Sequence, residues 1–260
     1  MASQTALITG ASAGIGRALA HEFARDGAGL ILTARRGERL HQLAAELRSA
    51  CGAEVEVIPL DLARAGAAQT LYDELKHRGI AVDVLVNNAG FGVFGRFATV
   101  ELQRHRELLQ LNICALTELC RLFLPPMIER GNGGILNVAS IAAFQAGPNL
   151  AAYYAGKAYV LSLTEALRYE YGGHGLSICC LAPGPTRTEF TGVAGMHTDA
   201  FYRLLAASPE QVARVGYRGF RRNRALIIPG VINKLGVFLT RLAPRALSRA
   251  VAGMIHAEKS

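Results

Sequence analysis

Tyr153 and Lys157 stand four residues apart in a segment whose pattern predicts a helix. At that spacing both side chains lie on one face of the helix. An ammonium group beside a phenol stabilises the phenolate and lowers the phenol's pKa from about 10 towards neutral pH. Such a phenol can pass a proton to or from a reacting oxygen. Tyr–Lys pairs also occur on solvated helices, so the pair alone is weak evidence of catalysis.

Ser140 follows directly after a predicted strand, and the helix of Tyr153 comes next along the chain. In doubly wound sheets, ligands bind outside the carboxyl ends of the strands. A Ser hydroxyl, a Tyr hydroxyl and a Lys gathered there could bind a carbonyl group and pass it a proton. The sequence therefore predicts a candidate catalytic group at this edge.

A glycine-rich stretch, Thr9-Gly10-Ala11-Ser12-Ala13-Gly14-Ile15-Gly16, joins the first predicted strand to an amphipathic helix. Glycines allow close approach to a phosphate, and the helix N-terminus offers free N–H groups to a pyrophosphate. The alternative is a tight strand-to-helix turn without a ligand. The position of the glycine-rich stretch at the first strand-to-helix junction favours dinucleotide binding over this alternative. The predicted contacts are Gly10, Ser12, Ala13, Gly14, Ile15 and Gly16.

The second predicted strand ends in Arg35 and Arg36, where an acidic residue would bind the ribose 2′-OH of NAD. Guanidinium groups suit a 2′-phosphate instead. Cations at the start of a helix oppose its dipole, which favours a ligand role over simple solvation. We therefore expect NADP(H) in preference to NAD(H). Asp61 and Leu62 are further expected contacts, with a helix N-cap as the alternative for Asp61.

Strand-like and helix-like segments alternate along most of the 260 residues. This alternation predicts an α/β fold with a doubly wound parallel sheet of about seven strands and helices on both faces. No linker or repeat interrupts it, so residues 1–260 are expected to form one domain. The expected strands are 5–9, 29–34, 55–60, 82–87, 134–139, 176–182 and, weakly, 225–229. The expected helices are 14–27, 37–50, 65–78, 100–130 (one or two helices) and 151–172.

Over residues 4–190 the chain resembles the short-chain dehydrogenases/reductases, which have the Rossmann fold. The resemblance rests on Thr9-Gly10-x-x-x-Gly14-x-Gly16, Asn87-Asn88-Ala89-Gly90, Asn112, Ser140, Tyr153-x-x-x-Lys157 and Pro183-Gly184-Pro185-Thr186-Arg187-Thr188, in the family's order and spacing. The arginines after the second strand resemble a subgroup of 3-oxoacyl and steroid-type ketone reductases, which does not specify a substrate.

The resemblance implies a catalytic tetrad of Asn112, Ser140, Tyr153 and Lys157. Tyr153 would be the general acid/base, Ser140 would hold the carbonyl oxygen, and Asn112 would hold a relay water. Lys157 would bind the nicotinamide ribose and lower the pKa of Tyr153. Ala13 departs from members that have a basic residue there, which leaves the 2′-phosphate to Arg35 and Arg36. Further implied cofactor contacts are Asn88, Ala89, Gly90, Tyr153, Lys157, Pro183, Gly184, Thr186 and Thr188.

The expected function is therefore hydride transfer between NADP(H) and an apolar ketone, aldehyde or 3-oxoacyl-type substrate, including thioester-linked ones. Substrate contacts are expected from Ser140 and Tyr153 and from Phe91, Phe144 and Phe190. Two alternatives stay open: an NAD-dependent alcohol dehydrogenase of the same family, and a non-catalytic dinucleotide sensor or scaffold. The family resemblance implies a homodimer or homotetramer.

The net charge of +8 is concentrated in the last 47 residues, which carry ten basic residues and one acidic residue, Glu258. The remaining chain is nearly neutral, so we expect no nucleic-acid partner. Residues 185–224 are expected to form a substrate loop and lid helix, and 225–260 a basic amphipathic extension. For the whole basic tail from Ser208 onwards, which includes helix-spaced arginines at 214–222, the favoured interpretation is a solvated basic face over an apolar stripe packed on the sheet or a partner subunit. Contact with an anionic membrane surface and docking of an acidic carrier are considered but not favoured.

Five cysteines without a CxxC spacing predict reduced thiols and hence a cytoplasmic protein. Cys179 and Cys180 are expected on opposite faces of one strand. The histidines show no metal-ligand spacing, so no metal is expected. The first strand is expected to begin near Thr5, so no signal peptide is expected, and no apolar run is long enough to predict a membrane span.

Overall fold

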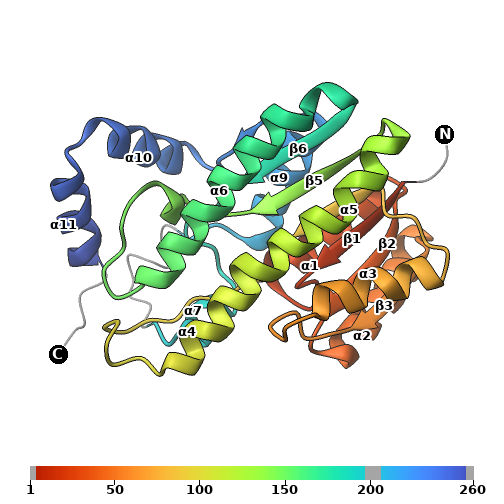
Figure 1. Ribbon diagram of the computed structural model, residues 1–260, viewed down its shortest axis with the longest axis horizontal. Helices are drawn as coiled ribbons and strands as arrows, with labels where there is room; N and C mark the ends of the chain where they lie inside the picture. The colour runs from red at the N-terminus through yellow and green to blue at the C-terminus, as the bar shows by residue number, and fades with distance from the viewer. Residues whose placement is uncertain (1–3, 197–205, 256–260) are drawn as a thin grey trace.

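The computed structural model describes residues 4–196 and 206–255, which form one parallel sheet with helices on both faces. The strand order is β3-β2-β1-β4-β5-β6-β7, and every neighbouring pair is parallel (Figure 1). The predicted fold class is confirmed. The strands are β1 (Thr5–Thr9), β2 (Gly29–Ala34), β3 (Val55–Pro59), β4 (Val84–Asn87), β5 (Gly133–Val138), β6 (Leu176–Leu181) and β7 (Leu226–Ile227).

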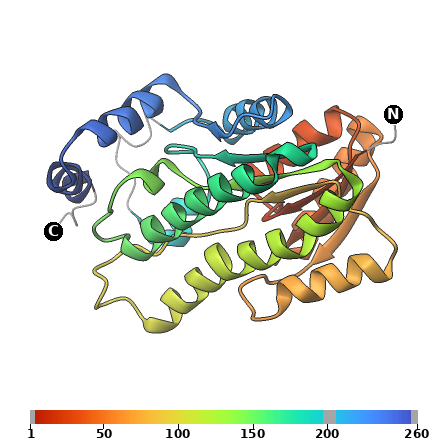
Figure 2. The same ribbon diagram turned by 45° about the horizontal axis from the view of Figure 1, so that its top comes forward.

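Alternate residues of each strand enter two separate apolar layers, so the strands are buried on both sides. Ile8 packs with helices α1 (Gly14–Arg25), α2 (Gly37–Cys51) and α9 (Pro209–Arg221), whereas Leu7 packs with α3 (Ala67–His77), α5 (Leu116–Arg130) and α6 (Ala151–Tyr171). Figure 2 shows this layering. Cys179 and Cys180 fall in different layers, which confirms the prediction of opposite faces.

One long helical stretch runs from α4 (Leu102–Leu109) through a π-helix (Gln110–Ala115) into α5. By length and composition this stretch could cross a membrane, but 44% of its most apolar window is buried inside the fold. Leu119 and Phe123 pack in the same apolar layer as β4 and β5, as in a core helix. The π-turn includes Asn112, and such irregular turns are frequent at functional sites.

Helix α9 begins at a capping box: the Ser208 hydroxyl accepts from the Gln211 N–H, and the Gln211 side-chain oxygen accepts from the Ser208 N–H. The helix lies against α1, where Tyr217 contacts the ring of Phe23 edge to face at 4.8 Å between ring centroids. The four arginines that share its outer face, Arg214, Arg218, Arg221 and Arg222, are exposed. A solvated basic face over a packed apolar stripe is thus correct for α9.

The last two described helices, α10 (Val231–Leu242) and α11 (Arg245–Ile255), are separated at Pro244 and lie at one end of the molecule, on the left in Figure 1. Their apolar stripe does not pack on the sheet, and its packing on a partner subunit stays a prediction. Leu235, Phe238 and Leu247 are each more than half exposed. The periodicity indicates which side of a helix is apolar, but not what covers that side.

Candidate active site

A cleft opens at the carboxyl ends of the strands, and the segments that follow β1 to β6 line it. This is where a doubly wound sheet holds its ligands. All of the predicted catalytic side chains except Asn112 line the cleft. So do the predicted cofactor contacts except Gly16, which lies behind the glycine-rich turn. The lining includes Gly10, Ser12, Ala13, Gly14, Ile15, Arg35, Arg36, Asp61, Leu62, Asn88, Ala89, Gly90, Ser140, Tyr153, Lys157, Pro183, Gly184, Thr186 and Thr188.

The glycine-rich turn is locked to the end of β4 by hydrogen bonds. Asn88 donates from its side chain to the carbonyl of Thr9 at 2.8 Å, and the Thr9 hydroxyl accepts from the N–H groups of Asn88 and Ala89. Gly10 adopts φ +66°, which favours glycine. A Cβ on Gly16 would lie 2.4 Å from the Asn88 amide and 2.5 Å from the Gly10 carbonyl oxygen. The turn therefore requires glycine here to stay closed against β4.

Replacing Gly16 with alanine is expected to displace this turn and to weaken dinucleotide binding roughly tenfold or more, because the helix N-terminus shifts away from the pyrophosphate site. Titration of NADPH fluorescence measures the affinity. Gly236→Ala is the matched control, since a Cβ there meets nothing within 4 Å. Equal affinities of the two variants would contradict a role of the turn in dinucleotide binding.

Lys157 lies on α6, one turn after Tyr153, and is almost completely buried. Its ammonium group donates to the carbonyl of Val138 at 2.8 Å and lies 5.8 Å from the centre of the Tyr153 ring. Burial lowers the pKa of Lys157 from 10.5 to about 8, partly opposed by the nearby Cys180 thiol. The cation thus lies beside the phenol, as the spacing predicts.

Tyr154 differs from its neighbour in its surroundings. Burial raises the pKa of its phenol to about 12, only partly offset by a hydrogen bond with Gln145. Its ring packs against Gly147, where an added Cβ would lie 2.3 Å from the ring. A phenol with a raised pKa is a poor proton donor near neutral pH. Tyr154 therefore serves as packing beside Tyr153.

Two further side chains of the predicted tetrad make local contacts. Ser140 caps the short 3-10 helix η2 (Ile141–Phe144): its hydroxyl accepts from Ala142 N–H at 3.1 Å and faces the carbonyl of Pro183. Asn112 binds the backbone of Phe91 through both amide atoms, at 2.9 and 3.1 Å. A Cβ on Gly90 would lie 3.0 Å from the Asn112 oxygen and 3.5 Å from the Lys157 nitrogen, so all three residues adjoin.

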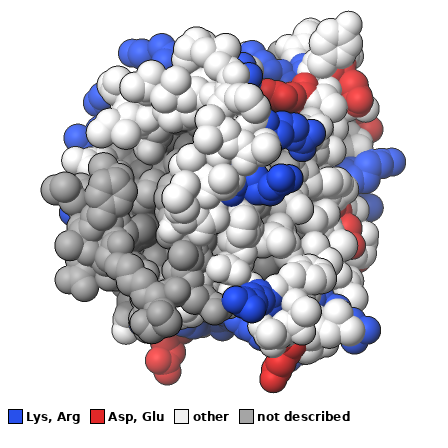
Figure 3. All heavy atoms as spheres, turned by 90° about the vertical axis from the view of Figure 1, so that its left-hand side faces the viewer, with Lys and Arg blue, Asp and Glu red and all other residues white. Residues whose placement is uncertain are grey.

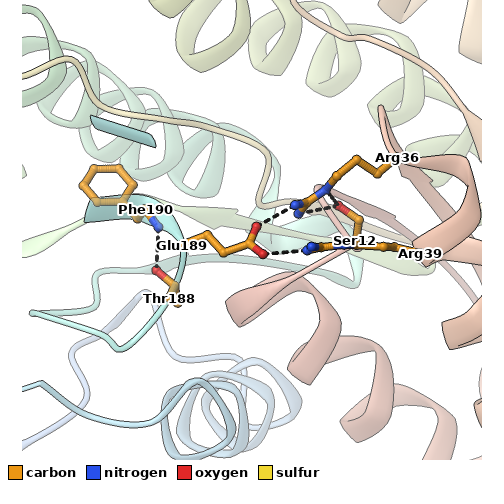
Figure 4. A network of polar contacts seen from close by, with 6 residues as sticks. All are labelled: Ser12, Arg36, Arg39, Thr188, Glu189 and Phe190. Atoms are coloured by element: carbon orange, nitrogen blue, oxygen red, sulfur yellow. Dashed lines mark hydrogen bonds and ion pairs between the residues drawn. The ribbon is translucent and has the colours of Figure 1, made fainter. Parts of the chain in front are cut away.

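At the other end of the cleft, two arginines hold a carboxylate that the sequence did not single out. Arg36 and Arg39 form ion pairs with Glu189 at 2.7 and 2.5 Å, and Arg36 also donates to the Ser12 hydroxyl (Figure 4). These hydrogen bonds lower the pKa of Glu189. The contact joins two walls of the cleft, because Glu189 follows β6 whereas both arginines belong to the start of α2.

The predicted substrate contacts are only partly brought together. Phe91 and Phe190 line the cleft, and the Phe190 ring lies 5.1 Å from that of Tyr153. Phe144 is not among the lining residues; it packs under Arg241 of α10, 5.9 Å from its ring centre. The short helix α7 (Phe190–Ala194) adds Val193, and Met196 follows it. Within 185–224, α7 lines the cleft and α9 does not, while residues 197–205 lie outside the described residues.

Asp61 lines the cleft and also accepts a hydrogen bond from Ala63 N–H at 3.1 Å, so the local turn and the cleft both use this side chain. Among residues 4–196 and 206–255, no group of three or more His, Cys, Asp or Glu side chains could hold a metal ion.

The chain is similar to known proteins over its whole length. A family model described as short chain dehydrogenase matches residues 4–197. Sulfoacetaldehyde reductase 2 of Chromohalobacter salexigens is 39% identical over 207 residues, covering 77% of this chain and 81% of that protein.

Two solved structures resemble the fold closely. A short-chain dehydrogenase from Sphingobium yanoikuyae in complex with NADPH has a TM-score of 0.82 and 32% identity, covering 99% of this chain and 96% of that one. The bulky-bulky ketone specific alcohol dehydrogenase from Comamonas testosteroni has a TM-score of 0.80 and 28% identity, covering 100% and 96%.

Proposed function

This chain belongs to the short-chain dehydrogenase family of oxidoreductases, and we propose that it is an NADP(H)-dependent enzyme that interconverts an apolar ketone or aldehyde and its alcohol. The proposal is supported mainly by one arrangement: a single cleft has Tyr153, Lys157 and Ser140 at one end and arginine side chains at the other. The glycine-rich turn lies between them, where a dinucleotide would lie.

The residues present fit a dinucleotide. The close approach of β4 to the turn leaves no room for side chains at Gly10 and Gly16, which keeps the backbone of the turn free for a pyrophosphate. Arg35 lines the cleft after β2, where this chain has no carboxylate for the 2′-OH of NAD. When bound, NADP(H) would supply or accept the hydride.

The chain's own residues would handle the proton. Ser140 would hold the substrate oxygen, and Tyr153 would give its phenolic proton to that oxygen during reduction or take it back during oxidation. The buried Lys157 ammonium group would stabilise the phenolate. Asn112, held on the backbone of Phe91, would position the segment beside Lys157, and a relay water at Asn112 stays part of the proposal.

The proposed substrate is apolar near its carbonyl group, and 3-oxoacyl thioesters stay within the proposal. Phe91, Phe190, Val193 and Met196 surround the space beside Tyr153, which favours hydrocarbon over charged groups. The similar Comamonas enzyme is described as specific for bulky-bulky ketones. NADPH oxidation assayed with 3-oxoacyl thioesters, steroids, quinones and simple aldehydes would identify the class.

Arg35→Ala tests the cofactor proposal. The variant is expected to bind NADPH at least roughly tenfold more weakly, since a charged hydrogen bond to the 2′-phosphate is lost, and to bind NADH almost as before. Both affinities can be measured by fluorescence titration, with Arg64→Ala, an exposed arginine outside the cleft lining, as the control. An equal loss for both cofactors would exclude the 2′-phosphate role of Arg35.

A further inference from the structure

Helices α10 and α11 expose apolar side chains in helical rows. Val231, Leu235, Phe238 and Leu242 repeat with the spacing of one helix face, and Leu247, Val251 and Met254 do so on α11. Of the sixteen large apolar side chains exposed in the described residues, nine belong to these helices. We call these nine the C-terminal apolar face: Val231, Ile232, Leu235, Phe238, Leu239, Leu242, Leu247, Val251 and Met254. Clusters of this kind mark interaction sites, unlike single exposed residues.

The other sides of the two helices hold them in place. Val237 and Ala252 are buried, and the Asn233 amide donates to the carbonyl of Pro229 at 2.7 Å. Asn233 also packs directly on Gly184, where an added Cβ would lie 2.3 Å from its oxygen. The C-terminal apolar face is therefore not the side by which the helices attach to the fold. It is available to a partner while they stay attached.

The charge around this face selects the partner. Lys234, Arg241, Arg245 and Arg249 lie on the same two helices, and residues 211–257 contain no Asp or Glu. Figure 3 looks at this end of the molecule and shows a wide uncharged surface with more Lys and Arg than Asp and Glu side chains at its margin. A two-fold contact between copies through these helices would bring cations against cations. A surface with negative charge over hydrocarbon matches both properties.

We propose that α10 and α11 bind peripherally to a membrane that contains anionic phospholipids. The C-terminal apolar face enters the boundary between headgroups and acyl chains, and Lys234 and Arg241 beside it contact the headgroup phosphates. Arg245 and Arg249, on the other side of α11, add longer-range attraction to the anionic surface. The attached side of α10 adjoins the cleft, because Asn233 packs on Gly184, a lining residue. Enzyme on a membrane therefore holds its cleft close to apolar molecules dissolved there. Vesicle binding does not depend on turnover, so this proposal stands apart from the proposed reaction.

Co-sedimentation of the full chain with vesicles tests this. We expect the protein to pellet with phosphatidylcholine vesicles that contain phosphatidylglycerol at low salt. Its affinity for vesicles of pure phosphatidylcholine, or for the anionic vesicles at high salt, is expected to be at least roughly tenfold lower. The pair Leu235→Ser and Phe238→Ser is expected to reduce binding at least roughly tenfold. Its control is the pair Phe97→Ser and Leu102→Ser, which are equally exposed but lie elsewhere.

A second set of variants separates local charge from net charge. Lys234→Glu with Arg249→Glu is expected to abolish the preference for anionic vesicles. Arg222→Glu with Arg224→Glu changes the net charge equally outside α10 and α11 and is expected to bind nearly as wild type. Thermal unfolding followed by circular dichroism verifies that each variant is folded.

Two results would overturn the proposal. One is a failure of the wild-type chain to pellet with anionic vesicles at low salt. The other is an oligomer that only the Leu235/Phe238 pair dissociates, without vesicle binding, because the face would then join copies of this chain.

Discussion

Tyr153→Phe is expected to lower turnover by about two to four orders of magnitude while NADPH binding stays nearly unchanged. Phenylalanine keeps the ring contacts with Tyr154 and Phe190 and removes only the hydroxyl. The proton for the substrate oxygen then has no donor on α6 at that position. NADPH oxidation with a substrate from the proposed class measures turnover, and fluorescence titration measures binding.

The adjacent tyrosine provides a matched control. Tyr154→Phe removes a hydroxyl from the same helix at a buried position, and turnover is expected to fall only a few-fold. If the two variants lost the same activity, the loss would reflect packing of α6 and not proton transfer. A wild-type chain that binds NADPH but turns over no substrate, with Tyr153→Phe indistinguishable from it, would favour the sensor alternative.

Lys157→Met is the second change with a large expected effect, and it should affect activity and stability in opposite directions. Turnover is expected to fall by at least about two orders of magnitude, because the phenolate of Tyr153 loses the adjacent cation. Stability at pH 7 is expected to be retained or increased. The buried ammonium group destabilises the fold by about 3 kcal/mol, which exceeds the one hydrogen bond to Val138 that is lost.

The sign of the pH dependence follows from the lowered pKa of Lys157, about 8 in the folded chain against 10.5 when unfolded. Between these values the unfolded chain binds more protons, so this group makes the folded state more stable as the pH rises. Below pH 8 the destabilisation is fully present. Between pH 7 and 9 the wild type should therefore gain about 1 kcal/mol relative to Lys157→Met.

Urea titrations of both proteins at pH 7, 8 and 9 measure this difference. The buried thiols and Tyr154, whose pKa values burial raises, also titrate at alkaline pH. The contributions of Cys120 and Tyr154 cancel in the comparison, because the substitution does not touch them. Lys157 lowers the pKa of Cys180, but burial keeps that pKa far above 9, so the folded thiol stays protonated in both proteins over this range. A constant stability difference across the three pH values would mean that Lys157 keeps an ordinary pKa.

The fold could be predicted from the sequence because its signals are local. Each strand of a parallel sheet is a short apolar run, and all seven predicted strands form, with boundaries shifted by one or two residues at several ends. The π-turn at Gln110–Ala115 was not predicted, because its residues continue the helical pattern on both sides.

The parts of the site that the sequence missed depend on contacts between distant residues. Glu189 meets Arg36 and Arg39 across about 150 residues, and no spacing rule connects them. Phe144 was expected at the substrate because it follows Ser140, but Arg241 of α10 covers it. The glycine-rich turn and the Tyr153–Lys157 pair could be predicted from the sequence, because each belongs to one continuous segment.

The Glu189 contact also affects how a long ligand enters and leaves. It links the two walls of the cleft, because Arg36 and Arg39 on one wall form ion pairs with the Glu189 carboxylate on the other. Both ion pairs are nearly half exposed, so each contributes at most about 1 kcal/mol. Thermal motion therefore breaks these ion pairs readily, and dissolved salt weakens them further. A dinucleotide would therefore bind and leave without unfolding of either wall, and the ion pairs would re-form by rotation of side chains alone.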